Sequence, residues 1–233
     1  MAGTAIIAGL GPGFCEEFAW KLAREGHPVG MFARSEDYLA SVEEALQDAG
    51  FSARALALDV TDPDAIADGI EEVRSELGPV EVLAHMASTV TSASAVELDP
   101  DRFEMMWRLY AYGGLLCFRE VLPDMREHGG TVLFFGASRD AGDFAFKSGK
   151  GAARGLARAI SDEYATEGIH AAHVIIDGGL LNPDVYDSGG DVDEADYIDP
   201  VAAAETCYHL VSQPPRARTF ELDLHAIDRT APL

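Results

Sequence analysis

Short apolar runs alternate with longer amphipathic segments along almost the whole of this 233-residue chain. Runs such as Thr-Ala-Ile-Ile-Ala-Gly-Leu and Thr-Val-Leu-Phe-Phe are apolar at nearly every position, which is typical of parallel strands covered on both faces. The expected strands cover residues 4–10, 28–33, 53–59, 80–87, 130–137, 170–177 and 219–224. The expected helices lie near residues 13–26, 36–49, 64–77, 100–128, 146–167 and 200–213. This alternation predicts an α/β fold with a mostly parallel, doubly wound sheet of about seven strands.

No repeat, linker or low-complexity stretch divides the sequence, so we expect a single domain over residues 1–233. Residues 182–199 differ from the rest, because seven of these eighteen residues are Asp or Glu. This segment is a candidate acidic lid over a substrate; the alternative is a solvated surface loop.

The chain carries 40 acidic and 17 basic residues, which gives a formal charge of −23. Such a charge repels phosphate backbones and anionic bilayers, so we expect neither a nucleic-acid nor a membrane partner. No apolar run has the length of a membrane span, and we expect a cytoplasmic protein. Acidic surfaces also suit high intracellular salt, which favours a halophilic source over an acidic protein from an ordinary one. The three cysteines are isolated in sequence and indicate neither a metal site nor a disulfide framework.

A glycine-rich turn directly follows the first expected strand and opens a helix. It contains Gly9, Gly11, Pro12, Gly13 and Phe14. Glycines allow a tight turn and a close approach of backbone to a pyrophosphate, while the helix start offers free N–H groups. This position in an alternating α/β chain predicts a Rossmann-like dinucleotide site.

The end of the second strand carries Arg34 and Ser35. An acidic residue at this place would bind the ribose 2′-hydroxyl of NAD, whereas arginine accommodates a 2′-phosphate. The sequence therefore favours NADP(H) over NAD(H). The alternative is a surface ion pair of Arg34 with Glu36 or Asp37.

Two later stretches have the order of a known family. Residues 129–138 read GGTVLFFGAS, and residues 146–179 begin with Phe-Lys-Ser-Gly-Lys and continue through Gly-Ile-His-Ala into a buried strand. This resembles the short-chain dehydrogenase/reductase family, in which a strand ends in Ser and Tyr-x-x-x-Lys opens a long helix. The resemblance covers nearly the whole chain, but Phe146 stands where the family has its tyrosine.

The resemblance implies roles for several side chains. Ser138 would bind the substrate oxygen, and Lys150 would bind the nicotinamide ribose. Tyr110 falls at the position of the family's asparagine and is a candidate substitute for the missing phenol. The alternative is that Tyr110 belongs to the apolar stripe of its helix, together with Met106 and Cys117.

The remaining implied contacts are with the cofactor and with other copies of the chain. Asp59 and Val60 would hold the adenine, although Asp59 could instead cap the following turn. Ala87 is retained from the family's Asn-Asn-Ala-Gly and Gly178 from its Pro-Gly. His85 is kept as a minor candidate, with a satisfied core histidine as the alternative. Small residues near Gly149 suggest a homodimer or homotetramer, or simply close packing on the sheet.

Three functional hypotheses follow. The first is an oxidoreductase that moves hydride between NADP(H) and a small-molecule carbonyl or alcohol, with a non-standard or missing proton donor. The second is a catalytically silent NADP(H)-binding sensor or structural subunit. The third is a reaction that needs no phenol, such as reduction of an activated double bond.

Overall fold

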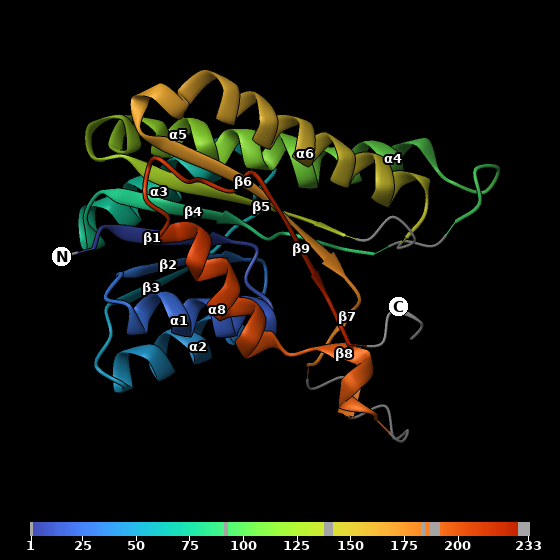
Figure 1. Ribbon diagram of the computed structural model, residues 1–233, viewed down its shortest axis with the longest axis horizontal. Helices are drawn as coiled ribbons and strands as arrows, with labels where there is room; N and C mark the ends of the chain where they lie inside the picture. The colour runs from blue at the N-terminus through green and yellow to red at the C-terminus, as the bar shows by residue number, and fades with distance from the viewer. Residues whose placement is uncertain (1, 91–92, 138–141, 183–184, 187–191, 228–233) are drawn as a thin grey trace.

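The computed structural model describes residues 2–90, 93–137, 142–182, 185–186 and 192–227. Seven parallel strands form one sheet in the order β3-β2-β1-β4-β5-β6-β9 (Figure 1). These strands are β1 (Thr4–Ala8), β2 (Val29–Ala33), β3 (Ala53–Ala57), β4 (Val80–His85), β5 (Gly130–Ala137), β6 (Ile169–Asp177) and β9 (Glu221–His225). The predicted α/β class and the doubly wound parallel sheet are confirmed.

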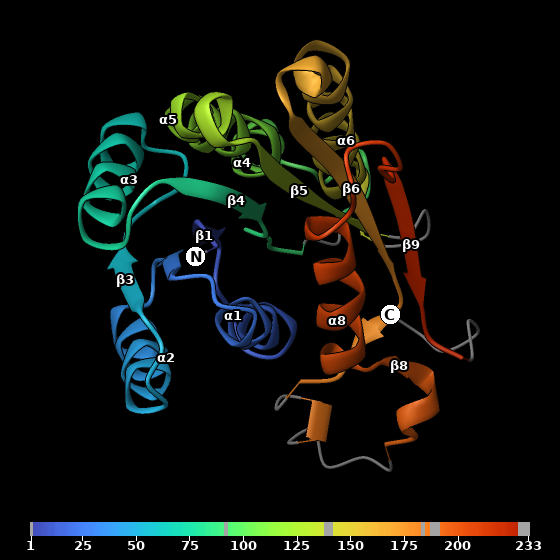
Figure 2. The same cartoon turned by 60° about the vertical axis from the view of Figure 1, so that its left-hand side comes forward.

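Helices cover both faces of the sheet (Figures 1 and 2). One face carries α1 (Phe14–Arg24), α2 (Glu36–Asp48) and α8 (Pro200–Val211). The other carries α3 (Pro63–Leu77), α4 (Pro100–Trp107), α5 (Gly113–His128) and α6 (Phe144–Tyr164). Because apolar strand residues face both layers, the chain has one core on each side of the sheet.

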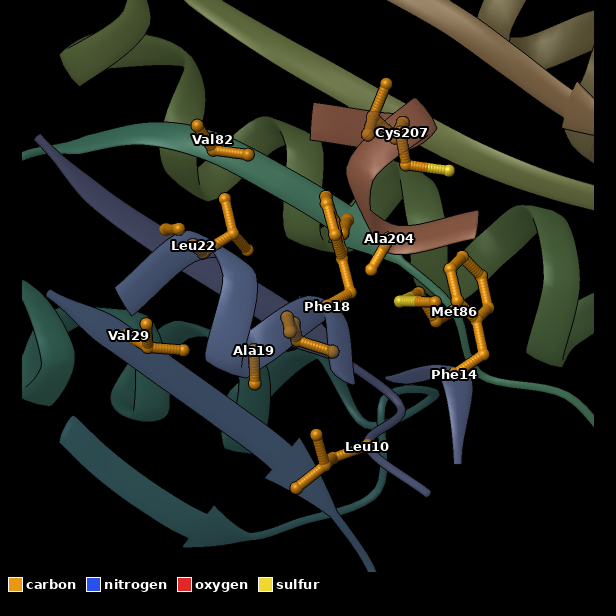
Figure 3. Close-up of a cluster of buried hydrophobic side chains, with 14 of the residues drawn as sticks. Leu10, Phe14, Phe18, Ala19, Leu22, Val29, Val82, Met86, Ala204 and Cys207 are labelled. Atoms are coloured by element: carbon orange, nitrogen blue, oxygen red, sulfur yellow. The ribbon is translucent and has the colours of Figure 1, made fainter. Parts of the chain in front are cut away.

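The core beneath α1 and α8 shows how the first layer is held (Figure 3). Phe18 and Leu22 of α1 are fully buried and pack with Val82 of β4 and Cys207 of α8. Phe14 places its ring edge against Phe135 of β5, with 5.6 Å between the ring centroids. These contacts fix the start of α1, and with it the glycine-rich turn, above the middle of the sheet.

Short capping signals in the sequence set several helix starts. Asp62 accepts hydrogen bonds from the backbone of Asp64 and Ala65, and Asp99 accepts one from Asp101. In both helices a proline occupies the first position, where no N–H is needed. Asp143 caps α6 in the same way, so this helix begins two residues earlier than the sequence predicts.

The single long helix expected over residues 100–128 is interrupted. Between α4 and α5, Arg108–Tyr112 form a turn of π-helix. This turn carries Tyr110 into the core, with 1% of its surface exposed, whereas Trp107 remains exposed. A regular α-helix would have placed Trp107 and Tyr110 on the same face.

Smaller elements complete the chain. Residues Ala165–Glu167 and Glu194–Asp196 form 3₁₀ turns, and β7 (Gly179–Leu180) pairs in parallel with β8 (Tyr197–Ile198). Across the described ranges, none of the helices combines the length and apolar character required to cross a bilayer.

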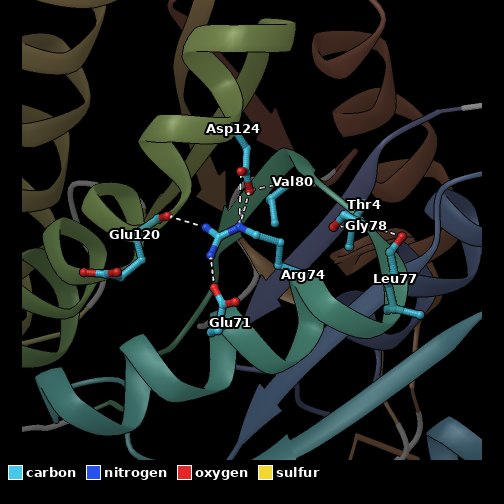
Figure 4. A network of polar contacts seen from close by, with 8 residues as sticks. All are labelled: Thr4, Glu71, Arg74, Leu77, Gly78, Val80, Glu120 and Asp124. Atoms are coloured by element: carbon cyan, nitrogen blue, oxygen red, sulfur yellow. Dashed lines mark hydrogen bonds and ion pairs between the residues drawn. The ribbon is translucent and has the colours of Figure 1, made fainter.

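An ion-pair network joins α3 and α5 at the edge of the sheet where the strands begin (Figure 4). Arg74 donates from Nε to Asp124 at 2.9 Å, from Nη1 to Glu71 at 2.6 Å and from Nη2 to the Glu120 carbonyl at 2.7 Å. Asp124 also accepts the backbone N–H of Val80, the first residue of β4. The network therefore anchors the two helices to the start of a central strand.

We expect Arg74→Met to lower the free energy of unfolding by about 1–3 kcal/mol, because Asp124 would lose its charged partner while remaining largely buried. Urea unfolding would measure this loss. The matched control is Arg126→Met, whose pair with Glu167 is exposed and should contribute less than about 1 kcal/mol. Equal losses in the two variants would contradict the anchoring role of Arg74.

Candidate active site

The glycine-rich turn lies between β1 and α1, at the carboxyl edge of the sheet. Gly9 and Gly13 have φ angles of 103° and 79°, a region that favours glycine. Gly13 is the N-cap of α1 and provides no side chain to bond the first N–H groups of the helix. A Cβ at Gly11 would meet no atom within 4 Å. The turn therefore has free donors, a positive helix end and open space, which fit the phosphates of a dinucleotide.

Gly9→Ala should damage this turn, because the new Cβ would lie 2.2 Å from the backbone N and Cα of Ala87. With the unfavourable φ angle, we expect a loss of about 2–4 kcal/mol of stability together with weaker cofactor binding. Gly11→Ala is the control and should leave stability nearly unchanged. Thermal unfolding and NADPH fluorescence titration would measure both, and an unaffected Gly9→Ala protein would contradict the close approach.

Arg34 and Ser35 follow β2 and are exposed. Within the described ranges Arg34 forms no ion pair, so the alternative pairing with Glu36 or Asp37 is not seen. After β3, the Asp59 carboxylate accepts the backbone N–H and the hydroxyl of Thr61, at 2.8 and 2.9 Å. Asp59 thus caps the turn, as the alternative interpretation proposes, while Val60 is buried beside it.

The loops after β4 and β6 complete this edge. Ala87 donates its N–H to the Ala8 carbonyl at 2.9 Å, which holds the loop after β4 against the glycine turn. Gly178 joins β6 to β7 with a φ angle of 153°. Asn182 lies close to Gly13, where an added Cβ would be 3.0 Å from the Asn182 Cβ. Ser138 lies outside the described residues.

Lys150 is the central polar group of the site. It lies on α6 with 9% of its surface exposed, and its Nζ donates to the Phe135 carbonyl at 2.9 Å. The pairing of β4 with β5 ends at Phe134, so this carbonyl lies at the point where the two strands separate. Nζ is also 4.3 Å from the centroid of the Tyr110 ring and 5.7 Å from that of Phe146. Burial lowers the pKa of Lys150 to about 7, which the nearby Cys15 thiol opposes.

Tyr110 and Phe146 pack edge to face, with 5.8 Å between their centroids. The Tyr110 hydroxyl donates to the Thr89 carbonyl and accepts the Thr89 N–H at 3.2 Å. Ser88 Oγ is 3.4 Å from the same hydroxyl. Burial raises the pKa of Tyr110, which keeps the phenol protonated. Its hydroxyl therefore has partners in the loop after β4.

His85 and Gly149 also take part in this packing. His85 Nε2 is 2.9 Å from the Leu109 carbonyl in the π-helical turn, and burial lowers the pKa of His85 to about 4. A neutral ring must then donate from Nε2 to this carbonyl, which corresponds to the satisfied core histidine considered above. A Cβ at Gly149 would lie 2.4 Å from the Tyr110 ring, so Gly149 serves close packing against the π-helical turn.

Sequence reasoning missed two groups at this edge. Asp143 accepts the N–H of Phe146 and that of Ala93, each at 3.0 Å, and thereby ties the loop after β4 to the start of α6. The backbone of Thr89 binds Tyr110, as described above. An Asp three residues before Phe146 is a recognisable capping signal, but the long-range contacts have none in the sequence.

The acidic segment 182–199 borders a cavity of about 1010 Å³, which it shares with the start of α1, the start of α8 and the end of β9. Gly13, Asn182, Tyr197 and Asp199 are among its lining residues. The described part of the segment therefore lies next to the glycine turn.

The parallel sheet, the phosphate-compatible turn and the buried lysine together define a dinucleotide-binding α/β protein. The family described as short chain dehydrogenase matches residues 3–182. The chain therefore belongs to the short-chain dehydrogenase family of oxidoreductases, whose fold binds a nicotinamide cofactor.

Individual relatives are distant. The uncharacterized oxidoreductase YxbG of Bacillus subtilis is 25% identical over 171 residues, which cover 71% of this chain but only 63% of that protein. The crystal structure of a short-chain dehydrogenase from Rhodopseudomonas palustris is 26% identical, with a TM-score of 0.82, over 96% of this chain and 98% of that chain. A metagenomic short-chain oxidoreductase in complex with NADP is 21% identical, with a TM-score of 0.77, over 95% and 96% of the two chains.

Proposed function

We propose that this protein binds NADP(H) and transfers hydride between this cofactor and a small carbonyl or alcohol substrate, with a non-standard or missing proton donor. The observation that carries the proposal is Lys150, a buried amine at the point where β4 and β5 separate. Burying a lysine is costly, so a position that keeps one, in a chain with only three, indicates a ligand. The ribose hydroxyls of a nicotinamide nucleotide suit this amine.

The residues that would hold the cofactor lie along one edge of the sheet. The start of α1 would bind the phosphates, Arg34 the 2′-phosphate, Val60 and Ala87 would border the adenine and ribose, and Lys150 the second ribose. When bound, the nicotinamide would supply or accept the hydride. Phe146 cannot exchange a proton, and the Tyr110 hydroxyl is already held by Thr89. A proton must therefore come from another group or from water.

Arg34→Ala tests the cofactor preference. We expect the Kd for NADPH to rise by about 10- to 100-fold, because one charge-assisted contact to phosphate is lost, while the Kd for NADH stays unchanged. Fluorescence titration in concentrated KCl would measure both. The control is Arg119→Ala, an exposed arginine on α5. An equal change for the two nucleotides, or no change, would contradict the NADP(H) preference.

The silent NADP(H)-binding subunit is the second candidate, and the aromatic contact of Phe146 with Tyr110 favours it, because both side chains are engaged in packing. An assay of hydride transfer over a panel of carbonyls and alcohols separates the two proposals. Turnover by the natural chain supports the enzyme, and tight NADPH binding without turnover supports the silent subunit.

We also propose a homodimer or homotetramer. The outer side of α6 has open space at Gly151 and Gly155, and the neighbouring α4 and α5 expose Trp107 and Leu115. Light scattering on the purified protein would test this, and a monomeric mass would contradict it.

A further inference from the structure

A second buried titratable group, His173 on β6, lies beneath α6 and has no place in the function proposed above. It is 4% exposed, and neither ring nitrogen forms a hydrogen bond within the described part of the chain. An unbonded buried imidazole is unfavourable, so its presence calls for a physical reason. His170, three residues earlier on the same strand, differs because its ring nitrogens contact the Leu210 and Thr219 carbonyls.

One side of the His173 ring leads toward solvent. His173 is paired in register with Glu221 of the edge strand β9, and its Nδ1 lies 3.3 Å from Glu221 Oε2. The two atoms are close but are not aligned for a hydrogen bond. The Glu221 side chain is 32% exposed and forms an ion pair with Arg154 of α6. Glu221 thus contacts both water and the buried ring.

The other side of the ring leads toward Lys150. A Cβ at Gly136 would lie 2.5 Å from His173 Nε2, so the ring occupies the space that a side chain at this position would fill. The preceding residue, Phe135, supplies the carbonyl that accepts the Lys150 Nζ–H. The imidazole and the amine therefore reach consecutive residues of β5, a gap that one water molecule could bridge.

We propose that His173 and Glu221 form a path that exchanges protons between Lys150 and solvent behind the cofactor site. In the inward direction, the Glu221 carboxyl takes a proton from water and passes it to Nδ1 of the neutral ring. Nε2 then releases its own proton toward the Lys150 amine, and the ring returns to its first tautomer. One proton enters and one leaves at each group, and no electrons are transferred. The role in catalysis rests on the function proposed above, because Lys150 would need its proton restored during turnover.

The charges around the two groups agree with this path. His173 faces Glu221 on β9 and Arg154 and Lys150 on α6; burial is the main cause that lowers its pKa, while Glu221 opposes the shift. A neutral imidazole has one N–H and one free lone pair, which a relay requires. The nearby His85 is unsuited, because its Nε2 is bound to Leu109.

Because the chain has only three lysines, its amines can be observed separately by NMR with ¹⁵N-labelled lysine. The rate at which the Lys150 Nζ protons exchange with water is the relevant quantity, with the signal assigned by Lys150→Arg. We expect His173→Asn and Glu221→Gln each to slow this exchange by on the order of 10²-fold, the lower range for loss of a positioned proton-transfer group. His170→Asn is the matched control and should leave the rate unchanged.

An unchanged exchange rate in Glu221→Gln, or an equal slowing in His170→Asn, would overturn the path. If His173→Asn does not fold, Glu221→Gln decides alone, since its side chain is at the surface. The measurement uses the protein without cofactor, so it is independent of the proposed function. NADPH titration of the same variants then separates the two: absence of binding in the natural chain refutes the function, whatever the exchange rates.

Discussion

Phe146→Tyr is expected to raise the rate of hydride transfer by about 10²- to 10⁴-fold, the contribution of a positioned general acid. Phe146 lies one helical turn before Lys150, and its ring centroid is 5.7 Å from the Lys150 ammonium. A phenol at this position would have a cation beside it, which lowers its pKa and prepares it to exchange a proton. The change in nicotinamide absorbance over a panel of carbonyls and alcohols would measure the effect.

The matched control is Phe144→Tyr, two residues earlier on the same helix. Phe144 is 60% exposed, so its phenol would enter solvent and should leave the rate unchanged. A gain in Phe146→Tyr from an inactive parent would support the silent subunit as the natural state. If an active parent gains nothing from the tyrosine, then Phe146 does not occupy the position of the proton donor.

Lys150→Met is expected to make the protein more stable while weakening cofactor binding. A pKa near 7 in place of the ordinary 10.5 corresponds to roughly 5 kcal/mol of folding free energy, which is an upper bound for the cost of burying the charge. Methionine has a similar length and no charge to desolvate. The lost ammonium contact to ribose should raise the Kd for NADPH by about 10- to 100-fold.

The stability gain should depend on pH in a defined direction. The unfolded chain binds more protons than the folded chain between pH 7 and 10.5, so the natural protein gains stability as pH rises through this range. The advantage of Lys150→Met is therefore largest at and below pH 7 and disappears toward pH 10.5. Urea unfolding from about pH 6 to about pH 10 would measure it.

Lys147→Met is the control for Lys150→Met, because Lys147 is exposed on the same helix and has no burial cost. It should change neither stability nor cofactor affinity appreciably. A destabilised Lys150→Met protein at every pH would show that the hydrogen bond to Phe135 and the contact with the Tyr110 ring outweigh the cost of burial.

The sheet was predictable from the sequence because strands buried on both faces leave continuous apolar runs. All seven strands lie within two residues of the expected bounds at each end. The Asp62-Pro63 and Asp99-Pro100 pairs likewise predict helix starts, since capping depends on adjacent residues. The glycine turn was predictable for the same reason, because its geometry depends on a few consecutive residues.

The side-chain contacts of the site were not predictable in this way. The π-helical turn at Arg108–Tyr112 has no signal in the apolar pattern, yet it determines where Tyr110 lies. The contact of His173 with Glu221 depends on the pairing of β6 with β9, two strands that are separated by α8. Such contacts arise from tertiary packing, which spacing along the chain does not encode.

The Arg74–Asp124 network and the cofactor residues lie at opposite edges of the sheet, separated by the length of the central strands. A strand of five residues such as β1 spans about 16 Å, and energetic effects over such distances usually add independently. Losses of stability from Arg74→Met should therefore sum with the changes at Phe146 or Lys150 in double variants. The fold thus separates the residues that keep it folded from those that determine its chemistry, so the reactive edge can change without weakening the anchor.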